Sequence, residues 1–229
     1  MVYKVLKSVM FCSFLSIVVI LGACTENDDS GSSRGELRFL NVIADEPRVD
    51  FSLDEDLITS SVSFLEATQY YRVDAMRYDF VVNQAGTFSE LLRDSNTIGK
   101  DKRYTFIACG PSDDTGSIFM LDNNVDSTDD RANLRFVNAV TSRLKVDAYV
   151  IPEKGPIPTV AAQSDIGSKG VTEYINGFPG NYRLEFRNSL NDNLVARSEW
   201  VNIKNGQVLS VILAGGEEGY SVAVIVENE

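Results

Sequence analysis

The stretch LRFLN at 37–41, followed by VD at 49–50, decides the fold of this chain because it occurs twice. Its second copy, LRFVN at 134–138 followed by VD at 146–147, lies at a constant offset of 97 residues. Six of the seven positions are identical, and only Leu40 changes, to Val137. Self-similarity at a fixed offset is typical of a repeated structural unit. We therefore expect the chain to contain two copies of one domain.

The residues between the motifs predict an all-β fold. Short segments rich in β-branched and aromatic residues alternate with turn residues, and helical periodicity is nearly absent. We expect about seven short strands in each copy, forming two tandem antiparallel β-sandwiches of immunoglobulin-like type. The predicted boundaries are repeat 1 at 36–122, a linker at 123–132 and repeat 2 at 133–229.

Later matches between the copies need a larger offset. Tyr70 matches Tyr174 and Tyr78 matches Tyr182, at an offset of 104 residues. The second copy is therefore expected to carry an insertion of seven residues, near the two prolines at 155–158.

The composition excludes several classes of function. The formal net charge is −12, and removal of an N-terminal segment carrying Lys4 and Lys7 would make the remainder more negative by two. Such a surface repels phosphate backbones, so we expect no nucleic-acid partner. The chain has no histidine, which excludes Ser-His-Asp and Cys-His nucleophile systems and histidine-ligated zinc.

The N-terminus has the pattern of an export signal. Lys4 and Lys7 precede a mostly apolar run from Val9 to Leu21, which is short for a membrane span of about 20 residues. The run ends in LGAC at 21–24, which resembles the bacterial lipobox. The resemblance implies that 1–23 is a lipoprotein signal peptide and that Cys24 is acylated, for example with palmitate. The alternatives are a permanent transmembrane anchor and an ordinary cleaved signal.

Residues 24–35 are interpreted as a flexible acidic tether, since the run TENDDSGSSR at 25–34 is polar and contains no apolar residue to bury. Several acyl chains hold a protein stably in a bilayer, so a lipid bilayer is the first expected partner. By analogy with lipoprotein sorting in Gram-negative bacteria, Thr25 in place of an aspartate favours the outer membrane. Which side of that membrane the protein faces stays open.

Four polar residues of the repeated motif are candidate structural pairs. Asn41 and Asp50 lie at equal distances from the turn at 44–47, and Asn138 and Asp147 repeat this arrangement. We expect each asparagine amide to face its aspartate carboxylate across a hairpin. The alternative is a catalytic carboxylate pair for glycoside hydrolysis, but that reaction needs two acids close together and each repeat offers one. We assign no catalytic residue.

Acidic residues also gather between the repeats, where four of them are weak candidates for a calcium site: Asp122, Asp126, Asp129 and Asp130. They lack the glycine and the terminal glutamate of an EF-hand loop. A solvated linker is the preferred interpretation, and we expect no metal or other cofactor.

Cys109 aligns with Ala214, so we expect a small buried residue and no reactive nucleophile. The aromatic residues of the strands offer a second alternative, because they would suit either a sugar-stacking platform or core packing. We favour packing for this set: Tyr70, Tyr71, Tyr78, Tyr174, Tyr182 and Trp200.

The two openings, LRFLN…VD and LRFVN…VD, placed after a lipobox, resemble the bacterial secreted domain-of-unknown-function family 4397. The resemblance extends from about Leu37 to Val226 and implies tandem sandwich domains and an extracytoplasmic location, but no chemistry. We expect a non-enzymatic binding or structural module of the cell envelope, with a protein or polysaccharide partner. The alternative is a carbohydrate-active hydrolase that uses carboxylates alone.

Overall fold

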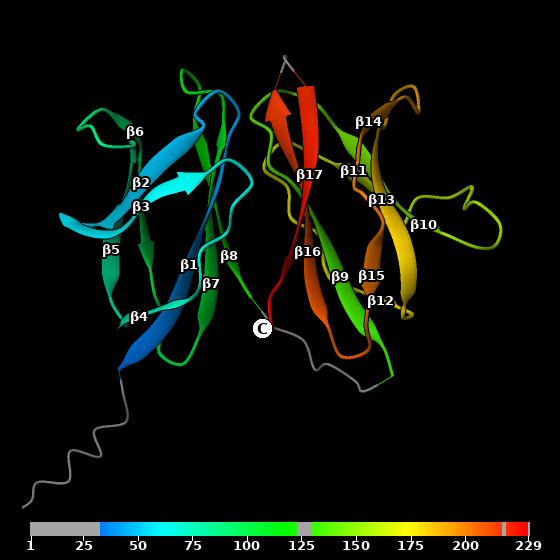
Figure 1. The fold of residues 1–229 in the computed structure, drawn as a ribbon, viewed down its shortest axis with the longest axis horizontal. Helices are drawn as coiled ribbons and strands as arrows, with labels where there is room; N and C mark the ends of the chain where they lie inside the picture. Colours follow the sequence, from blue (N-terminus) through cyan, green and yellow to red (C-terminus); the bar gives the residue numbers. More distant parts are fainter. Residues whose placement is uncertain (1–32, 123–129, 217–218, 229) are drawn as a thin grey trace, which may run out of the picture. The chain divides into compact units, whose positions relative to one another are not determined.

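A computed structural model describes residues 33–122, 130–216 and 219–228 (Figure 1). These residues form seventeen β-strands and no helix, so this part of the chain contains no helix long and apolar enough to cross a membrane. The predicted signal peptide 1–23, Cys24 and the tether up to residue 32 lie outside the described residues. The all-β prediction is confirmed.

The first repeat consists of two four-stranded sheets. Sheet order β4-β1-β7-β8 forms one layer and β3-β2-β5-β6 the other. The strands are β1 (Arg34–Ile43), β2 (Arg48–Leu53), β3 (Asp56–Ser63), β4 (Tyr71–Asp74), β5 (Arg77–Gln84), β6 (Glu90–Thr97), β7 (Arg103–Gly110) and β8 (Gly116–Leu121).

The second repeat has the same arrangement with one additional strand. Sheet β12-β9-β16-β17 corresponds to β4-β1-β7-β8, and sheet β11-β10-β13-β14, with β15 also paired to β13, corresponds to the other layer. The strands are β9 (Ala132–Asn138), β10 (Val146–Pro152), β11 (Gln163–Ile166), β12 (Ile175–Gly177), β13 (Gly180–Asn188), β14 (Leu194–Arg197), β15 (Val201–Ile203), β16 (Val208–Gly216) and β17 (Gly219–Val226).

The sequence had predicted purely antiparallel sheets, and this part of the prediction is wrong. In each repeat the opening strand runs parallel to the penultimate one, with Phe39 opposite Phe106 in the pair β1–β7 and Phe136 opposite Val211 in the pair β9–β16. The reason is that the chain changes sheets after the opening strand. The repeated motif therefore joins the two layers of a sandwich instead of forming a hairpin.

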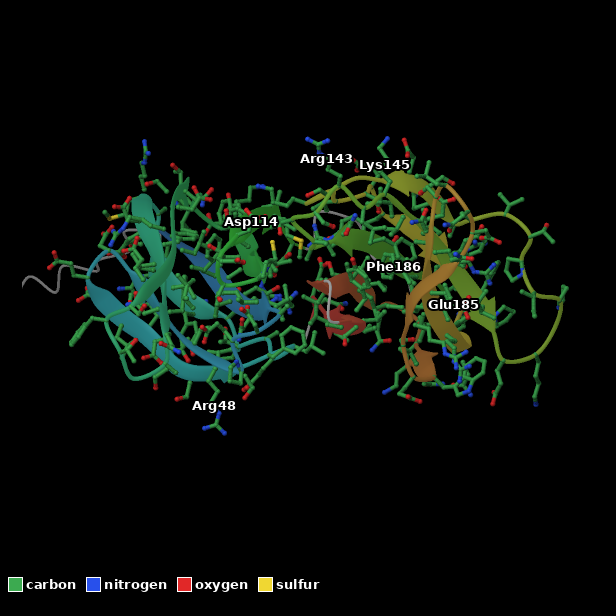
Figure 2. All side chains as sticks on the ribbon, turned by 90° about the horizontal axis from the view of Figure 1, so that it is seen from above. Arg48, Asp114, Arg143, Lys145, Glu185 and Phe186 are labelled. Atoms are coloured by element: carbon green, nitrogen blue, oxygen red, sulfur yellow. The ribbon has the colours of Figure 1, made fainter. Side chains whose placement is uncertain are left out.

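Each repeat encloses its own apolar core between its two sheets. Phenylalanines fill the first core, where Phe39 stacks on Phe51 with ring centroids 4.6 Å apart. In the second core, Phe186 of β13 is buried while its neighbour Glu185 belongs to the outward face, as the period of two along a strand requires (Figure 2).

A third apolar cluster lies between the repeats. Both faces of β1 and β7 are buried, because alternate residues such as Leu40 and Ile107 turn away from the sandwich core. They pack against the equivalent side chains of the second repeat, including Val137 and Ile212. The opening motif is thus a strand covered on both faces, which explains its continuous apolar character.

The strands β3 and β11 are not recognisable from the sequence pattern. The segments of β3 and β11 carry too few apolar residues to show an alternating pattern. The larger offset of the second repeat arises where it was expected, because the connection between β10 and β11 runs over 153–162 whereas that between β2 and β3 covers only 54–55. Ser61 and Asp165, 104 residues apart, then share a positive φ of 56° and 57°.

Candidate functional site

A buried polar network lies at the junction of the repeats. In the first repeat Arg38 of β1 donates from Nε to Thr105 Oγ1 at 2.7 Å, and Thr105 donates to Asp122 Oδ2 at 2.5 Å. Tyr70 also donates its hydroxyl to Asp122 Oδ2 at 2.8 Å, and its ring lies under the guanidinium of Arg38, 4.7 Å from the ring centroid. Protein groups therefore satisfy the Thr105 hydroxyl, the Tyr70 hydroxyl and the Nε of Arg38.

The second repeat builds the same arrangement from equivalent positions. Arg135 donates from Nε to Ser210 Oγ at 2.7 Å, Ser210 donates to Glu227 Oε1, and Tyr174 donates to Glu227 Oε2 at 2.5 Å. The Arg135 guanidinium lies 4.9 Å from the Tyr174 ring centroid. Tyr70 and Tyr174 thus belong to this network and do not form a sugar-stacking platform.

The two halves are joined by ion pairs that are not symmetric. Arg135 Nη2 contacts Asp122 Oδ1 at 2.5 Å and Glu227 Oε1 at 2.8 Å, whereas Arg38 Nε lies 3.7 Å from Asp122 Oδ2. Arg38 Nη2 has no hydrogen-bond partner among the described residues. Burial, and secondarily the nearby Glu227, raise the pKa of Asp122 above its ordinary value, although Arg38 and Arg135 act in the opposite direction.

Asp122, one of the calcium candidates, is a buried residue whose carboxylate is bound by protein groups. Both of its carboxylate oxygens are occupied by protein donors and its side chain is buried. Asp126 and Asp129 lie outside the described residues. Within the described ranges, no group of three or more acidic or cysteine side chains is placed to hold a metal ion, and Asp130 joins none.

The predicted contact between Asn41 and Asp50 is replaced by two separate roles. Asn41 donates from Nδ2 to Val62 O at 3.1 Å and accepts at Oδ1 from the Ile43 amide at 3.1 Å. Asp50 accepts from the amides of Ser61 at 2.8 Å and Gly86 at 2.9 Å. The two residues do not face each other because Asp50 alternates along β2 with the buried Val49 and Phe51 and so lies on the outward face of its sheet.

The second repeat confirms this correction. Asn138 donates from Nδ2 to the carbonyls of Leu144 at 2.9 Å and Ile166 at 3.0 Å. Asp147 accepts from the Asp165 amide at 2.8 Å and from Ser189 Oγ at 2.7 Å. All four side chains therefore form hydrogen bonds to backbone groups of neighbouring segments.

The other singled-out side chains are accounted for by packing. Cys109 is fully buried, and burial raises the pKa of its thiol to about 12, which opposes formation of the thiolate. Tyr78 and Tyr182 pack against the cores of their repeats. Trp200 is partly exposed and lies under the guanidinium of Arg183, 4.5 Å from the ring.

A groove of about 370 Å³ crosses the outward face of the sheet β3-β2-β5-β6. Its floor includes Ser52 and the nearly buried Val81, and two apolar side chains stand at its sides. Phe88, in the turn between β5 and β6, is completely exposed, and Leu57 of β3 is 61% exposed. The remaining lining residues are Asp50, Asp54, Glu55, Asn83, Thr87, Glu90 and Arg93.

The carboxylates of this groove are held as acceptors. Asp50 receives two backbone amides, Asp54 accepts from the Asp79 amide at 2.8 Å, and Glu90 pairs with Arg93 at 2.7 Å. Hydroxyl groups of a ligand can donate to the free lone pairs of these oxygens, while an exposed ring such as Phe88 offers a flat apolar surface. The groove therefore suits a neutral ligand with both hydroxyl groups and apolar faces.

Sequence reasoning missed this groove. Phe88 lies in the turn before β6, and neither Phe88 nor Leu57 belongs to a motif of the sequence. The available signal was the Gly86-Thr87 turn, which exposes the phenylalanine that follows it. The sequence gives no indication that this turn and β3 line the same groove, because β3 shows no alternating pattern.

Comparison with known proteins supplies a family but no activity. No curated protein matches the chain. Solved structures with partial likeness include a family 26 carbohydrate-binding module from Eubacterium rectale Amy13K in complex with maltoheptaose, at 10% identity and a TM-score of 0.28, covering 86% of this chain and 97% of that one. A streptococcal virulence factor described as binding α-glucan has the same identity and TM-score and covers 82% and 97%. Likeness at this level carries no argument about function.

A family model described as a domain of unknown function, DUF4397, matches residues 35–149. The match spans half of the chain, from the start of β1 through the first repeat and into β10 of the second. It includes both copies of the opening motif, on which the resemblance was based. The chain belongs to the DUF4397 family.

Proposed function

We propose that this protein is a bacterial envelope lipoprotein whose two immunoglobulin-like sandwiches act as a non-enzymatic binding module. The signal peptide 1–23 is removed, Cys24 carries the lipid, and the acidic residues that follow form the tether. The groove on the outward face of the first repeat takes an uncharged polysaccharide.

The observation that carries the proposal is the pairing of Phe88 with a polar groove. Phe88 is fully exposed and Leu57 is 61% exposed, and because both line the same groove they offer apolar contact area to a ligand there. Sugar rings present apolar faces to aromatic side chains and donate hydroxyl groups to carboxylates and amides. Asp50, Asn83 and Glu90 line the same groove and supply such acceptors.

The carboxylates of the groove favour binding over hydrolysis. A general acid in a glycosidase needs a raised pKa so that it is protonated when substrate binds. Among the described residues, the carboxyl group with a raised pKa is Asp122, which is buried between the repeats and far from solvent. Asp50, the repeated acid of the motif, is held by two backbone amides.

The binding test uses native gel retardation in a panel of uncharged polysaccharides, namely amylopectin, hydroxyethylcellulose and a soluble β-1,3-glucan. We expect at least one of them to retard the wild-type protein, and Phe88→Ala to remove about 1–3 kcal/mol of binding free energy, as for other aromatic anchors. Leu190→Ala is the matched control, since Leu190 is 91% exposed in the second repeat. Equal retardation of the two variants would exclude the groove as the site.

A second candidate ligand is a basic peptide. The groove lining contains four carboxylates and one arginine, so its formal charge is −3. A cationic partner would bind with a strong dependence on salt, whereas a neutral polysaccharide would not. The peptide would be favoured if no polysaccharide retards the protein but polylysine captures it in a salt-dependent way. Glu55→Gln should then weaken this capture.

The anchoring part of the proposal has its own test. Cells grown with radiolabelled palmitate should incorporate label into the wild-type chain and not into Cys24→Ala. Protease shaving of intact cells, with a periplasmic protein as control, then distinguishes a surface-facing protein from a periplasmic one. Label in the Cys24→Ala protein would exclude Cys24 as the lipidation site.

A further inference from the structure

The end of the first repeat at which β1 begins carries a cluster of basic side chains, called here the basic end. Its cations are Arg34, Arg72, Arg77, Lys100, Lys102 and Arg103. Its carboxylates are Glu36, Asp74 and Asp101. The basic end therefore has a formal charge of +3 in a chain whose net charge is −12. Positive charge is therefore concentrated at this end of the first repeat, whereas the chain as a whole is acidic.

Backbone contacts fix the basic end in one arrangement. The Asp101 amide donates to Arg34 O at 2.8 Å, and the Glu36 amide donates to Lys102 O at 2.8 Å, so the 99–102 turn is tied to the start of β1. Gly35 permits this close approach, because a Cβ at that position would lie 2.5 Å from Gly99 O. The cations are thus presented by a preorganised surface.

A pocket of about 240 Å³ opens in this surface. It is lined by Arg34, Gly35, Glu36, Arg72, Asp101, Lys102 and Arg103. Glu36 is shared between Arg103 at 2.5 Å and Arg72 at 3.5 Å, while Lys102 forms no ion pair with any described residue. Arg34 pairs with Asp74 at 3.1 Å through Nε, as Arg72 does with Glu36, but their side chains are 57% and 75% exposed, so the remaining guanidinium N–H groups can bind an anion from solvent.

The position of the basic end identifies the anion. The described fold starts at Ser33, and nine residues after Cys24 reach at most about 30 Å when fully extended. A lipid on Cys24 therefore keeps this end of the fold within reach of the bilayer surface. Headgroup phosphates of anionic lipids attract basic residues there, and the acidic remainder of the protein is screened beyond about 8–10 Å.

We propose that the basic end binds the phosphate groups of anionic phospholipids and thereby orients the first repeat on the membrane. The nearness of the basic end to the membrane rests on the proposed lipid anchor, whereas its contact with phospholipid headgroups does not need that anchor. Met76, which is 48% exposed in the turn before Arg77, adds an apolar side chain at the same end. The tether acids Glu26, Asp28 and Asp29 oppose the contact, so neutralising them should strengthen it.

The test is vesicle co-sedimentation of the chain from residue 24 onward with Cys24→Ser, which removes the lipid and retains the compact unit 32–229. We expect binding to phosphatidylglycerol-containing vesicles, no binding to pure phosphatidylcholine, and release at high salt. The double variant Arg72→Glu/Lys102→Glu should lower the partition coefficient at least about tenfold.

The matched control is Lys154→Glu/Lys204→Glu, which changes the net charge equally at exposed sites of the second repeat. An equal loss in both double variants, or no binding to anionic vesicles, would overturn the proposal. Polysaccharide retardation and palmitate labelling, measured on the corresponding full-length variants, report separately on the groove and on the anchor. A failure of either would leave the vesicle result unchanged.

Discussion

Arg38 and Arg135 occupy equivalent positions in the two repeats, and each donates to a backbone carbonyl of the other repeat's last strand region. Arg38 Nη1 contacts Val226 O at 2.8 Å, and Arg135 Nη1 contacts Leu121 O at 2.7 Å. The junction is therefore nearly two-fold symmetric, as is typical of an interface between two copies of one domain. A buried charge cluster and a shared apolar cluster join what the sequence presents as separate domains.

The asymmetry of the two arginines predicts unequal contributions to stability. Replacing Arg135 by methionine leaves Asp122 and Glu227 without their closest cation, so we expect a loss of about 3–5 kcal/mol of unfolding free energy. Arg38→Met should cost less, because its Nη2 has no partner among the described residues and Arg135 still neutralises Asp122. Urea denaturation measures both.

Arg48→Met serves as the control for these variants, since Arg48 is exposed and should change the free energy by no more than about 0.5 kcal/mol. Equal losses of unfolding free energy in Arg38→Met and Arg135→Met would show that the difference between the contacts of the two arginines does not affect stability.

Two carboxylates should show opposite dependences of stability on pH. The folded-state pKa of Asp122 is raised, so the folded protein binds its proton more tightly than the unfolded chain does. The stability of wild type relative to Asp122→Asn should therefore fall as pH rises from the ordinary range near 3.8 through the raised pKa. Denaturation of both proteins between pH 3 and 8 measures this difference.

Glu36 provides the matched comparison, because its hydrogen bond to Arg103 lowers its pKa from the ordinary value of 4.5. The advantage of wild type over Glu36→Gln is complete above 4.5 and should be lost as pH falls through the lowered pKa. A slope of the same sign for the two variants would contradict the assigned environment of Asp122.

Cys109 reports on opening of the contact between the repeats. Its thiol is buried in the shared apolar cluster, and burial raises its pKa to about 12. In the chain from residue 24 onward with Cys24→Ser, we expect no reaction with a thiol reagent at pH 8 until guanidinium is added. Rapid modification of the native protein would mean that the repeats separate readily in solution.

Gly35 is predicted to be intolerant of a side chain. A Cβ there would lie 2.5 Å from both Gly99 O and Ile98 Cγ2, so Gly35→Ala should lower the unfolding free energy by about 1–3 kcal/mol. Gly167→Ala is the control, because a Cβ at Gly167 meets no atom within 4 Å. Thermal unfolding compares the two, and a tolerated Gly35→Ala would mean that the 99–102 turn moves freely.

The repeated motif allowed the duplication and the β class to be predicted, but the spacing of its polar residues led to a wrong prediction of their contacts. Asn41 and Asp50 suggested a hairpin because they lie symmetrically about a turn, and a hairpin is the commonest result of that spacing. The chain instead crosses to the other sheet, and each residue holds a different backbone segment. Nothing in local periodicity distinguishes these two outcomes, since both place apolar residues on alternate positions.

The candidate groove depended on residues that no motif marks. Phe88 and Leu57 come from segments 31 residues apart in sequence and line the groove only because β2 lies between β3 and β5 in the sheet. Sequence patterns record which residues avoid water, and an exposed phenylalanine gives no such signal.

By itself, the sequence determined the all-β class, the two repeats and the residues that correspond between them, because alternation and repetition are properties of neighbouring positions. Only the tertiary structure decided that Arg38, Asp122, Arg135 and Glu227 meet at one junction and that β1 runs parallel to β7. Those relationships, like the hydrogen bond from Arg38 to the Val226 carbonyl across 188 positions, connect residues far apart in the chain. They depend on how sheets pack to bury both faces of the opening strands, which no local pattern specifies.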